Sequence, residues 1–179
     1  MILRNFLIFS SVVLLTISCA QKFPVPTDKE EGVMIFPVSV SNTSGHPGFA
    51  FSYNLIVEPE TKNVFKIFPA IGKKYILFGN IPSGTYSITG IEFIGHSTNK
   101  SSVSTAHQII KIKNAIFFEI KTGKVHILKD GMVIKKESTG IRSFTQGHDL
   151  YNVSDMEIEE ITKELKKLEN AEKWDFTQN

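Results

Sequence analysis

Histidine and carboxylate side chains are the residues of this chain whose types are suited to catalysis or metal binding. Four of the five histidines lie in polar, turn-like stretches of the sequence: His46, His96, His107 and His148. They lack the spacing of a His-x-x-x-His ligand pair, and a lone cysteine cannot complete a Cys/His zinc site. Only loops meeting at one end of a sheet would bring His96, His107 and Asp149 together. We therefore predict neither a metal ion nor another cofactor.

Motifs for nucleophilic and phosphoryl-transfer catalysis are missing from the sequence. There is no Gly-x-Ser-x-Gly turn, no Ser-x-x-Lys ahead of an apolar helix and no glycine-rich phosphate loop. Arginine, which binds phosphate in a bidentate manner, occurs only as Arg4 and Arg142 among 20 basic residues. With a net charge of +2, the composition gives no reason to expect a nucleic-acid partner. We predict a protein that is not an enzyme and has no catalytic residues.

Cys19 is the only cysteine, and its position indicates a different role. Residues 6–17 are uncharged and mostly apolar, and Arg4 precedes them. This run is shorter than the about 20 residues of a membrane-spanning helix but has the length of a secretory signal. Residues 16–20 read Thr-Ile-Ser-Cys-Ala, which resembles the lipobox of bacterial lipoproteins, although Thr16 stands where an aliphatic residue is usual. The resemblance implies a signal peptide over residues 1–18 and acylation of Cys19.

The alternative is ordinary signal cleavage after Ala20, which would leave a secreted protein, because Ser-Cys-Ala also resembles a small-x-small cleavage site. Acylation would anchor the chain to a membrane through its acyl chains. Ala20, by resemblance to sorting patterns, favours the outer membrane within the cell envelope. Two prolines and a charged stretch follow, so we predict a flexible tether over residues 19–32.

From Val33 onward the apolar residues mostly alternate, which is typical of strands with one buried face. The alternation changes register at Gly90, where we predict a β-bulge. The predicted strands cover residues 33–40, 49–57, 64–68, 75–78, 86–94, 108–113, 116–120, 125–128 and 132–134. Asp130-Gly131 suits a tight hairpin turn, and Thr122-Gly123 suits another turn.

Two segments carry a family resemblance. Residues 75–88 contain Ile-Pro-Ser-Gly-Thr-Tyr between two apolar runs, which resembles a hairpin of prealbumin-like and carboxypeptidase-regulatory-like β-sandwiches. Residues 116–128 are similar to the late hairpin of small bacterial lipoproteins with such sandwiches. The resemblance implies a mainly β protein with an antiparallel, prealbumin-like or Ig-like β-sandwich over residues 33–136. It implies no catalytic residues.

The chain closes with a predicted helix. Ser154 and Glu157 have the spacing of a capping box, and apolar residues then recur at three and four positions, which predicts a helix over residues 155–171. A connecting segment, 137–153, would precede this helix, and the helix and tail would span residues 154–179. The apolar stripe either packs on the chain's own sandwich or binds a partner.

Together these features predict an envelope lipoprotein with a non-enzymatic binding, adhesion or structural role. Two alternatives remain open: a subunit that docks into an envelope assembly through the C-terminal helix, and a metal-dependent enzyme with a loop-built histidine site. Any ligand is expected at the polar loops 42–48, 95–107 and 137–149, whose candidate residues are His46, His96, Asn99, His107 and His148. The sequence does not name the protein partner.

Overall fold

The computed structural model describes residues 22–27, 30–45, 48–99, 102–140 and 143–176, and this part of the chain is mainly β. Its strands are β1 (Glu31–Asn42), β2 (Phe51–Glu58), β3 (Lys66–Ile67), β4 (Tyr75–Pro82), β5 (Gly84–Asn99), β6 (Ser102–Ile120), β7 (Val125–Ile127), β8 (Asp130–Gly140) and β9 (Ser143–Asn152). The helix α1 (Asp155–Leu165) and the 3-10 turn η1 (Ala171–Lys173) follow near the C-terminus. The predicted signal and Cys19 lie outside the described residues.

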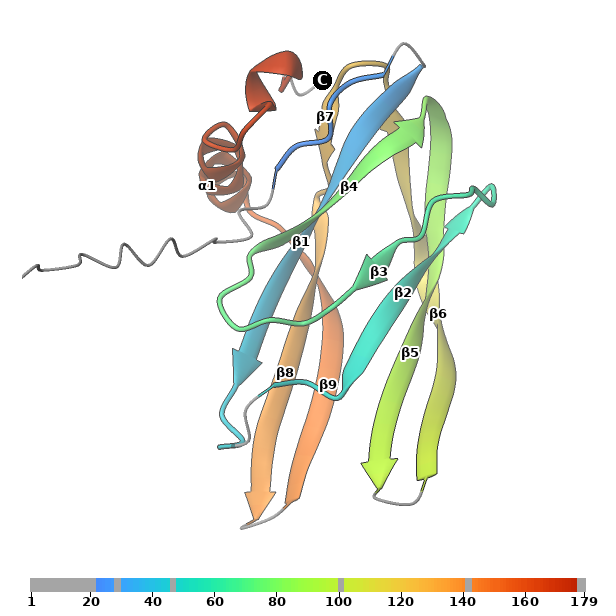
Figure 1. Cartoon of the computed structure of the whole chain (residues 1–179), viewed down its shortest axis with the longest axis vertical. Helices are drawn as coiled ribbons and strands as arrows, with labels where there is room; N and C mark the ends of the chain where they lie inside the picture. The colour runs from blue at the N-terminus through green and yellow to red at the C-terminus, as the bar shows by residue number, and fades with distance from the viewer. Residues whose placement is uncertain (1–21, 28–29, 46–47, 100–101, 141–142, 177–179) are drawn as a thin grey trace, which may run out of the picture.

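The strands form two sheets that share one core (Figure 1). One sheet has the order β4-β1-β8-β9, with β7 also paired to β1, and the other has the order β3-β2-β5-β6. Buried side chains of both sheets meet in a single cluster, which includes Met34 and Phe36 of β1 and Tyr53 and Leu55 of β2. The predicted β class is confirmed.

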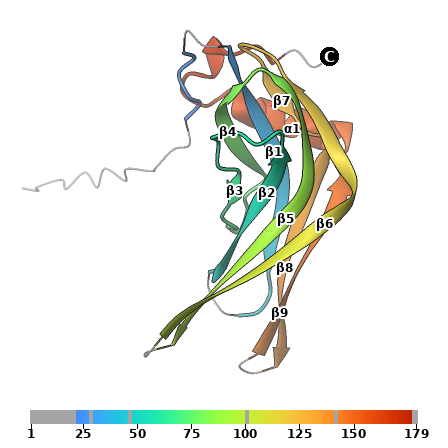
Figure 2. The same cartoon turned by 90° about the vertical axis from the view of Figure 1, so that its right-hand side faces the viewer.

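β1 is buried on both of its faces, because α1 covers the side of its sheet that faces away from the shared core (Figure 2). Val33 and Ile35 pack in a second cluster with Ile158, Ile161 and Leu165 of α1. An uninterrupted run of buried residues through β1 is what a strand covered on both faces requires. The helix stripe is thus occupied by the chain's own sheet.

Pairing is antiparallel between most neighbouring strands, but β1 pairs in parallel with both β7 and β8. β7 lies beside Val33–Ile35, and β8 continues along β1 from Val38. The predicted tight hairpin at Asp130-Gly131 is therefore wrong, since the strands on either side of it follow one another along the same neighbour instead of pairing with each other.

The two hairpins predicted for residues 75–88 and 116–128 are instead connections from one sheet to the other. The chain passes from β4 in one sheet to β5 in the other through Ser83, and from β6 back to β7 through residues 121–124. The turn itself forms where Gly123 was expected to favour it: Gly123 has a φ of 70°, and the Lys124 amide donates to the Lys121 carbonyl. Local turn chemistry is confirmed, whereas the pairing inferred from it is not.

β5 and β6 are longer than predicted, and the irregularity expected at Gly90 is confirmed. Ile88 pairs with Ile116 and Gly90 with Lys111, so residues 112–115 of β6 bulge out of the ladder. This bulge explains why residues 108–113 and 116–120 read as two strands in the sequence although they belong to one.

Two polar segments that were predicted to be loops are hairpin ribbons. Residues 95–107 extend the β5–β6 pair as far as Asn99 and Ser102, and residues 137–149 belong to the β8–β9 pair. Both ribbons reach the same end of the molecule (Figures 1 and 2). The predicted connecting segment 137–153 is likewise wrong, because its described residues up to Asn152 form the end of β8 and the whole of β9.

α1 begins where predicted but ends earlier. The Ser154 hydroxyl accepts a hydrogen bond from the Glu157 amide at 3.2 Å, which confirms the N-cap, while the Glu157 carboxylate accepts from the Tyr151 hydroxyl. The helix ends at Leu165, and Asn170 adopts a left-handed φ of 69° before η1. None of the described helices has the length and apolarity of a membrane span.

The predicted tether is wrong over the part of it that the structure describes. Phe23 is only 2% exposed and belongs to the cluster beneath α1, and β1 already begins at Glu31. Residues 22–24 are held by the C-terminal segment through contacts that the sequence pattern does not reveal.

Candidate functional site

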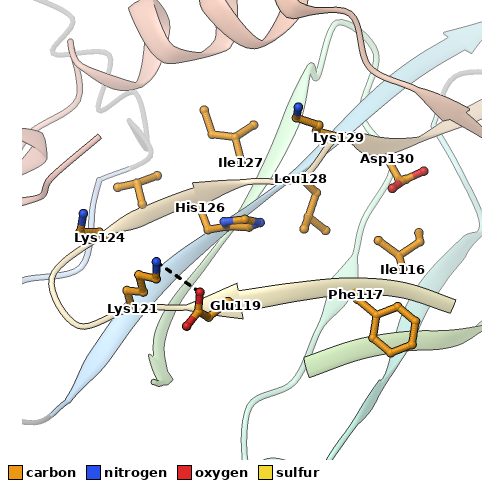
Figure 3. A pocket seen from close by; sticks show the side chains of 11 residues that line it. Ile116, Phe117, Glu119, Lys121, Lys124, His126, Ile127, Leu128, Lys129 and Asp130 are labelled. Atoms are coloured by element: carbon orange, nitrogen blue, oxygen red, sulfur yellow. Dashed lines mark ion pairs between the residues drawn. The ribbon is translucent and has the colours of Figure 1, made fainter. Parts of the chain in front are cut away.

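A pair of adjoining hollows, here called the edge groove, lies between β6 and the strands β7 and β9 of the other sheet. The hollow beside β7 has a volume of about 390 Å³ and the hollow beside β9 about 490 Å³. They share Ile116 and Asp130, so together they follow β6 from Ile110 to its end and continue to Lys121. Figure 3 shows the first hollow, with Ile116 and Leu128 pointing toward each other from its two walls.

The edge groove exists because both sheets end there. Within the described residues β6 is the last strand of one sheet and β9 the last strand of the other, so each has one edge without a paired strand. An unpaired strand edge presents N–H and C=O groups that another strand can bind. The bulge at residues 112–115 lies on the wall of the second hollow, where it bends β6 away from regular pairing with β5.

The floor of the groove is apolar because side chains from the inner faces of both sheets line it. On β6, Ile116 is buried, and Ile112 packs partly buried against the shared core. On β9, Leu150 lies opposite the buried Met132 and is 38% exposed, so it borders the second hollow without being covered.

The rim of the groove is rich in lysine. Five lysines line the two hollows: Lys111, Lys113, Lys121, Lys124 and Lys129. Three acidic residues line them as well: Glu119, Asp130 and Asp149. Lys121 is paired with Glu119 at 3.2 Å (Figure 3), and Lys124 with Asp175 at 3.3 Å. The net charge of the rim is therefore positive.

Two histidines also line the groove, one in each hollow. His126 stacks on Phe118 with ring centroids 6.3 Å apart, and His148 contacts Tyr53 edge-on at 5.2 Å. Burial lowers the pKa of both imidazoles below the ordinary value, so both are neutral near pH 7. A neutral imidazole offers one hydrogen-bond donor and one acceptor, which suits recognition of polar backbone groups.

The candidate residues from the sequence are not gathered at one place. His96 and Asn99 lie on β5 near the ribbon end, where their backbones pair with Thr105 and Ser102. His107 is exposed on β6, whereas His148 lines the edge groove from β9. His46 lies outside the described residues. The structure thus places His96, Asn99, His107 and His148 on strands rather than on loops.

His107 belongs to a polar network on the outer face of the four-stranded sheet. The Glu92 carboxylate accepts a hydrogen bond from the Asn54 amide at 2.7 Å and lies 3.0 Å from Nδ1 of His107. The bond from Asn54 and the contact with His107 lower the pKa of Glu92. Because Asn54 and Glu92 are directly opposite in the β2–β5 register, this network is a cross-strand contact.

Sequence reasoning missed the edge groove because its walls are distant in the chain. Its residues come from β6, from the stretch around β7 and from β9, a strand that was not predicted. No local signal in the sequence marks these walls: Phe117 of β6 is 75% exposed, but single exposed apolar side chains are ordinary on protein surfaces.

Neither metal coordination nor similarity to known proteins assigns a function. Among the described residues no group of three or more His, Cys, Asp or Glu side chains is arranged to hold a metal ion. No family model matches the chain, and neither a curated protein nor a solved structure matches it. The edge groove itself is therefore the strongest pointer to function.

Proposed function

We propose that this chain is a lipid-anchored protein of a bacterial envelope with a non-enzymatic binding role, and that the edge groove is its binding surface. The lipobox-like residues and the lone Cys19 support the anchor. A single cysteine has no intramolecular disulfide partner, so acylation gives the thiol of an exported chain a role. The outer membrane is the proposed location.

The observation that carries the binding role is the unpaired edge of β6 beside an apolar floor. An extended polypeptide segment fits such a surface, because its backbone can pair with the open strand while alternate side chains enter the hollow. The two hollows follow β6 from Ile110 to its end and continue to Lys121, a length that favours an extended occupant over a compact small molecule.

Charge favours an acidic segment of a partner protein. Lys111, Lys113 and Lys129 lie on the rim, and none of the three forms an ion pair with a carboxylate among the described residues. Acidic side chains of the occupant would meet these ammonium groups, and such complementarity accelerates association and fixes register.

The prealbumin-like character of the body is also part of this proposal. Two sheets with a common core support it, while the two parallel pairings of β1 depart from a purely antiparallel sandwich. The alternative in which the helix stripe binds an envelope partner loses support, because Ile161 and Leu165 are fully buried against the chain's own sheet.

The anchor is tested with Cys19→Ser in a bacterial host that acylates lipoproteins. We expect the native chain in the membrane fraction with an acylated N-terminus by mass spectrometry, and the variant in the soluble fraction. Equal membrane association of the two chains, or a native N-terminus beginning at Gln21, would contradict the anchor.

The groove is tested by NMR titration with two eight-residue peptides, one alternating Val and Glu and the other alternating Val and Lys. We expect the acidic peptide alone to shift amide signals of β6, with an affinity that falls as salt rises. Lys111→Glu/Lys113→Glu should weaken binding about tenfold or more. The control Lys62→Glu/Lys135→Glu changes the net charge equally at exposed sites outside the groove and should leave binding unchanged. Equal binding of both peptides, or of all variants, would refute the acidic occupant.

A further inference from the structure

The N-terminal segment, residues 22–24, is held by the C-terminal segment, residues 169–176, in a set of contacts that we call the terminal clamp. The Phe23 amide donates to the Glu169 carbonyl at 3.1 Å, and the Phe23 carbonyl accepts from the Asn170 side chain at 3.4 Å. The Trp174 indole donates to the Pro24 carbonyl at 2.8 Å. Three consecutive polar contacts thus fix the backbone where the chain enters the body.

Packing reinforces these hydrogen bonds. The Phe23 ring is buried and meets Phe176 edge-on with centroids 5.5 Å apart. Pro24 lies directly on β4 at Gly79, where a Cβ atom would come within 2.5 Å of the proline ring. Only glycine at this position leaves room for the segment.

Asn170 is the residue that makes the terminal clamp geometrically possible. Its left-handed φ of 69° reverses the chain after α1, and asparagine tolerates this conformation better than most residues. The reversal brings Ala171 and Trp174 back to the second core cluster, where both are buried. The C-terminal segment therefore reaches the N-terminal one only through this turn.

The terminal clamp limits how far the body can stand from an anchor at Cys19. Three residues lie between Cys19 and Phe23, and an extended chain spans at most about 14 Å over the four steps from one to the other. A free tether as far as Gly32 would reach about 45 Å. The point of entry lies beside α1, toward the end of the molecule opposite the two ribbons (Figures 1 and 2).

We infer that the terminal clamp holds the anchored body against the bilayer surface, with the α1 and η1 side toward the lipid headgroups and the ribbons pointing away. This inference rests on the proposed acylation of Cys19. The charge of this side is acidic rather than basic: α1 carries five acidic residues against Lys163 alone, and Lys22 is paired with Glu169 at 2.6 Å. The short link to Cys19, and not attraction to the headgroups, therefore holds the body at the surface.

The experiment uses the full acylated chain in vesicles of phosphatidylethanolamine and phosphatidylglycerol. A dye on Lys163→Cys, an exposed position of α1, reports energy transfer to acceptor-labelled headgroups. Gly79→Ala displaces Pro24, and Trp174→Phe removes the indole donor while keeping an aromatic ring. Each should lower the transfer efficiency about twofold as the tether lengthens. Gly147→Ala, where an added Cβ meets no atom within 4 Å, is the matched control and should leave the efficiency unchanged.

Trypsin cleavage after Lys22 reports the terminal clamp independently of the membrane. We expect protection in the native chain and cleavage in both clamp variants, with α1 still folded by circular dichroism. Cleavage after Lys22 in the native chain at the rate of the clamp variants would overturn the inference. Suppose that the clamp variants are sensitive to trypsin in the cleavage assay, and that the intact variants stay bound to vesicles with unchanged energy transfer. This result would overturn the inference and leave the proposed anchor standing. A native chain without acyl chains would overturn both.

Discussion

The two sheets differ in how many of their faces are covered, and this difference bears on where the proposed binding surface lies. The five-stranded sheet has the shared core on one face and α1 on the other, so β1 carries buried residues at consecutive positions from Gly32 to Val38. The four-stranded sheet is covered on one face, and β6 alternates between the buried Ile116, Phe118 and Ile120 and the exposed Phe117 and Glu119. Binding is therefore expected where the singly covered sheet ends, at the open edge of β6.

The largest expected effect on stability tests whether both faces of the five-stranded sheet are covered. Ile161→Ala removes a fully buried side chain from between α1 and β1, and we expect it to lower the free energy of unfolding by about 2–5 kcal/mol. Ile109→Ala makes the same chemical change on β6 at a residue that is 63% exposed, and its effect should stay within about 0.5 kcal/mol. Urea denaturation of both variants measures the difference. Equal losses would mean that α1 does not cover the sheet in solution.

A smaller effect is expected at the buried end of β8. Lys136 is 4% exposed, and its ammonium donates to the Gly48 carbonyl at 2.9 Å, which joins the five-stranded sheet to the loop before β2. Lys136→Met keeps the aliphatic stem but loses this bond, so we expect a loss of about 1–3 kcal/mol. The exposed neighbour Lys135→Met is the control and should change stability by less than about 0.5 kcal/mol. Equal stability of the Lys136→Met and Lys135→Met variants would refute the stabilising role of this hydrogen bond.

The histidines of the edge groove predict a pH dependence. Burial lowers the pKa of both His126 and His148 in the folded chain. At His126, Lys121 lowers the pKa further and Glu119 opposes the shift. At His148, Asp149 opposes it. Their stabilising contribution is present above the unfolded pKa of about 6.5 and is lost as the pH falls through the lower folded values.

Thermal unfolding between pH 7.5 and 5.5 measures this effect. We expect the native chain to lose stability toward pH 5.5 by no more than about 1.4 kcal/mol per pH unit for each histidine. His126→Phe/His148→Phe keeps both ring contacts and should flatten the profile. A variant with the same slope as the native chain would show that other groups titrate.

The smallest effect on stability is expected on the outer face of the four-stranded sheet. The hydrogen bond from Asn54 and the contact with His107 lower the pKa of Glu92, so its contribution is present above the unfolded carboxyl pKa and is lost as the pH falls through the folded value. Asn54→Ala should raise the pKa of Glu92 in an NMR titration while changing stability by less than about 1 kcal/mol. An unmoved pKa would contradict the cross-strand network.

The predictions that succeeded from the sequence concern local patterns. Alternation predicted most strands, the change of parity at Gly90 predicted the bulge, and Ser154 predicted the start of α1. The predictions that failed concern which segments lie next to each other in the folded chain. Polar stretches such as residues 95–107 read as loops, because their sequence lacks the alternating apolar residues that predict a strand.

The chain by itself determined the β class, the helix start and the turn at Gly123, because these depend on the φ preferences and side-chain periodicity of neighbouring residues. Only the tertiary structure decided that β1 takes two parallel neighbours, that β6 and β9 border the edge groove, and that Trp174 holds Pro24. Those contacts join residues far apart in sequence. Their free energy comes from burial and hydrogen bonds that form only after the sheets and the helix have packed.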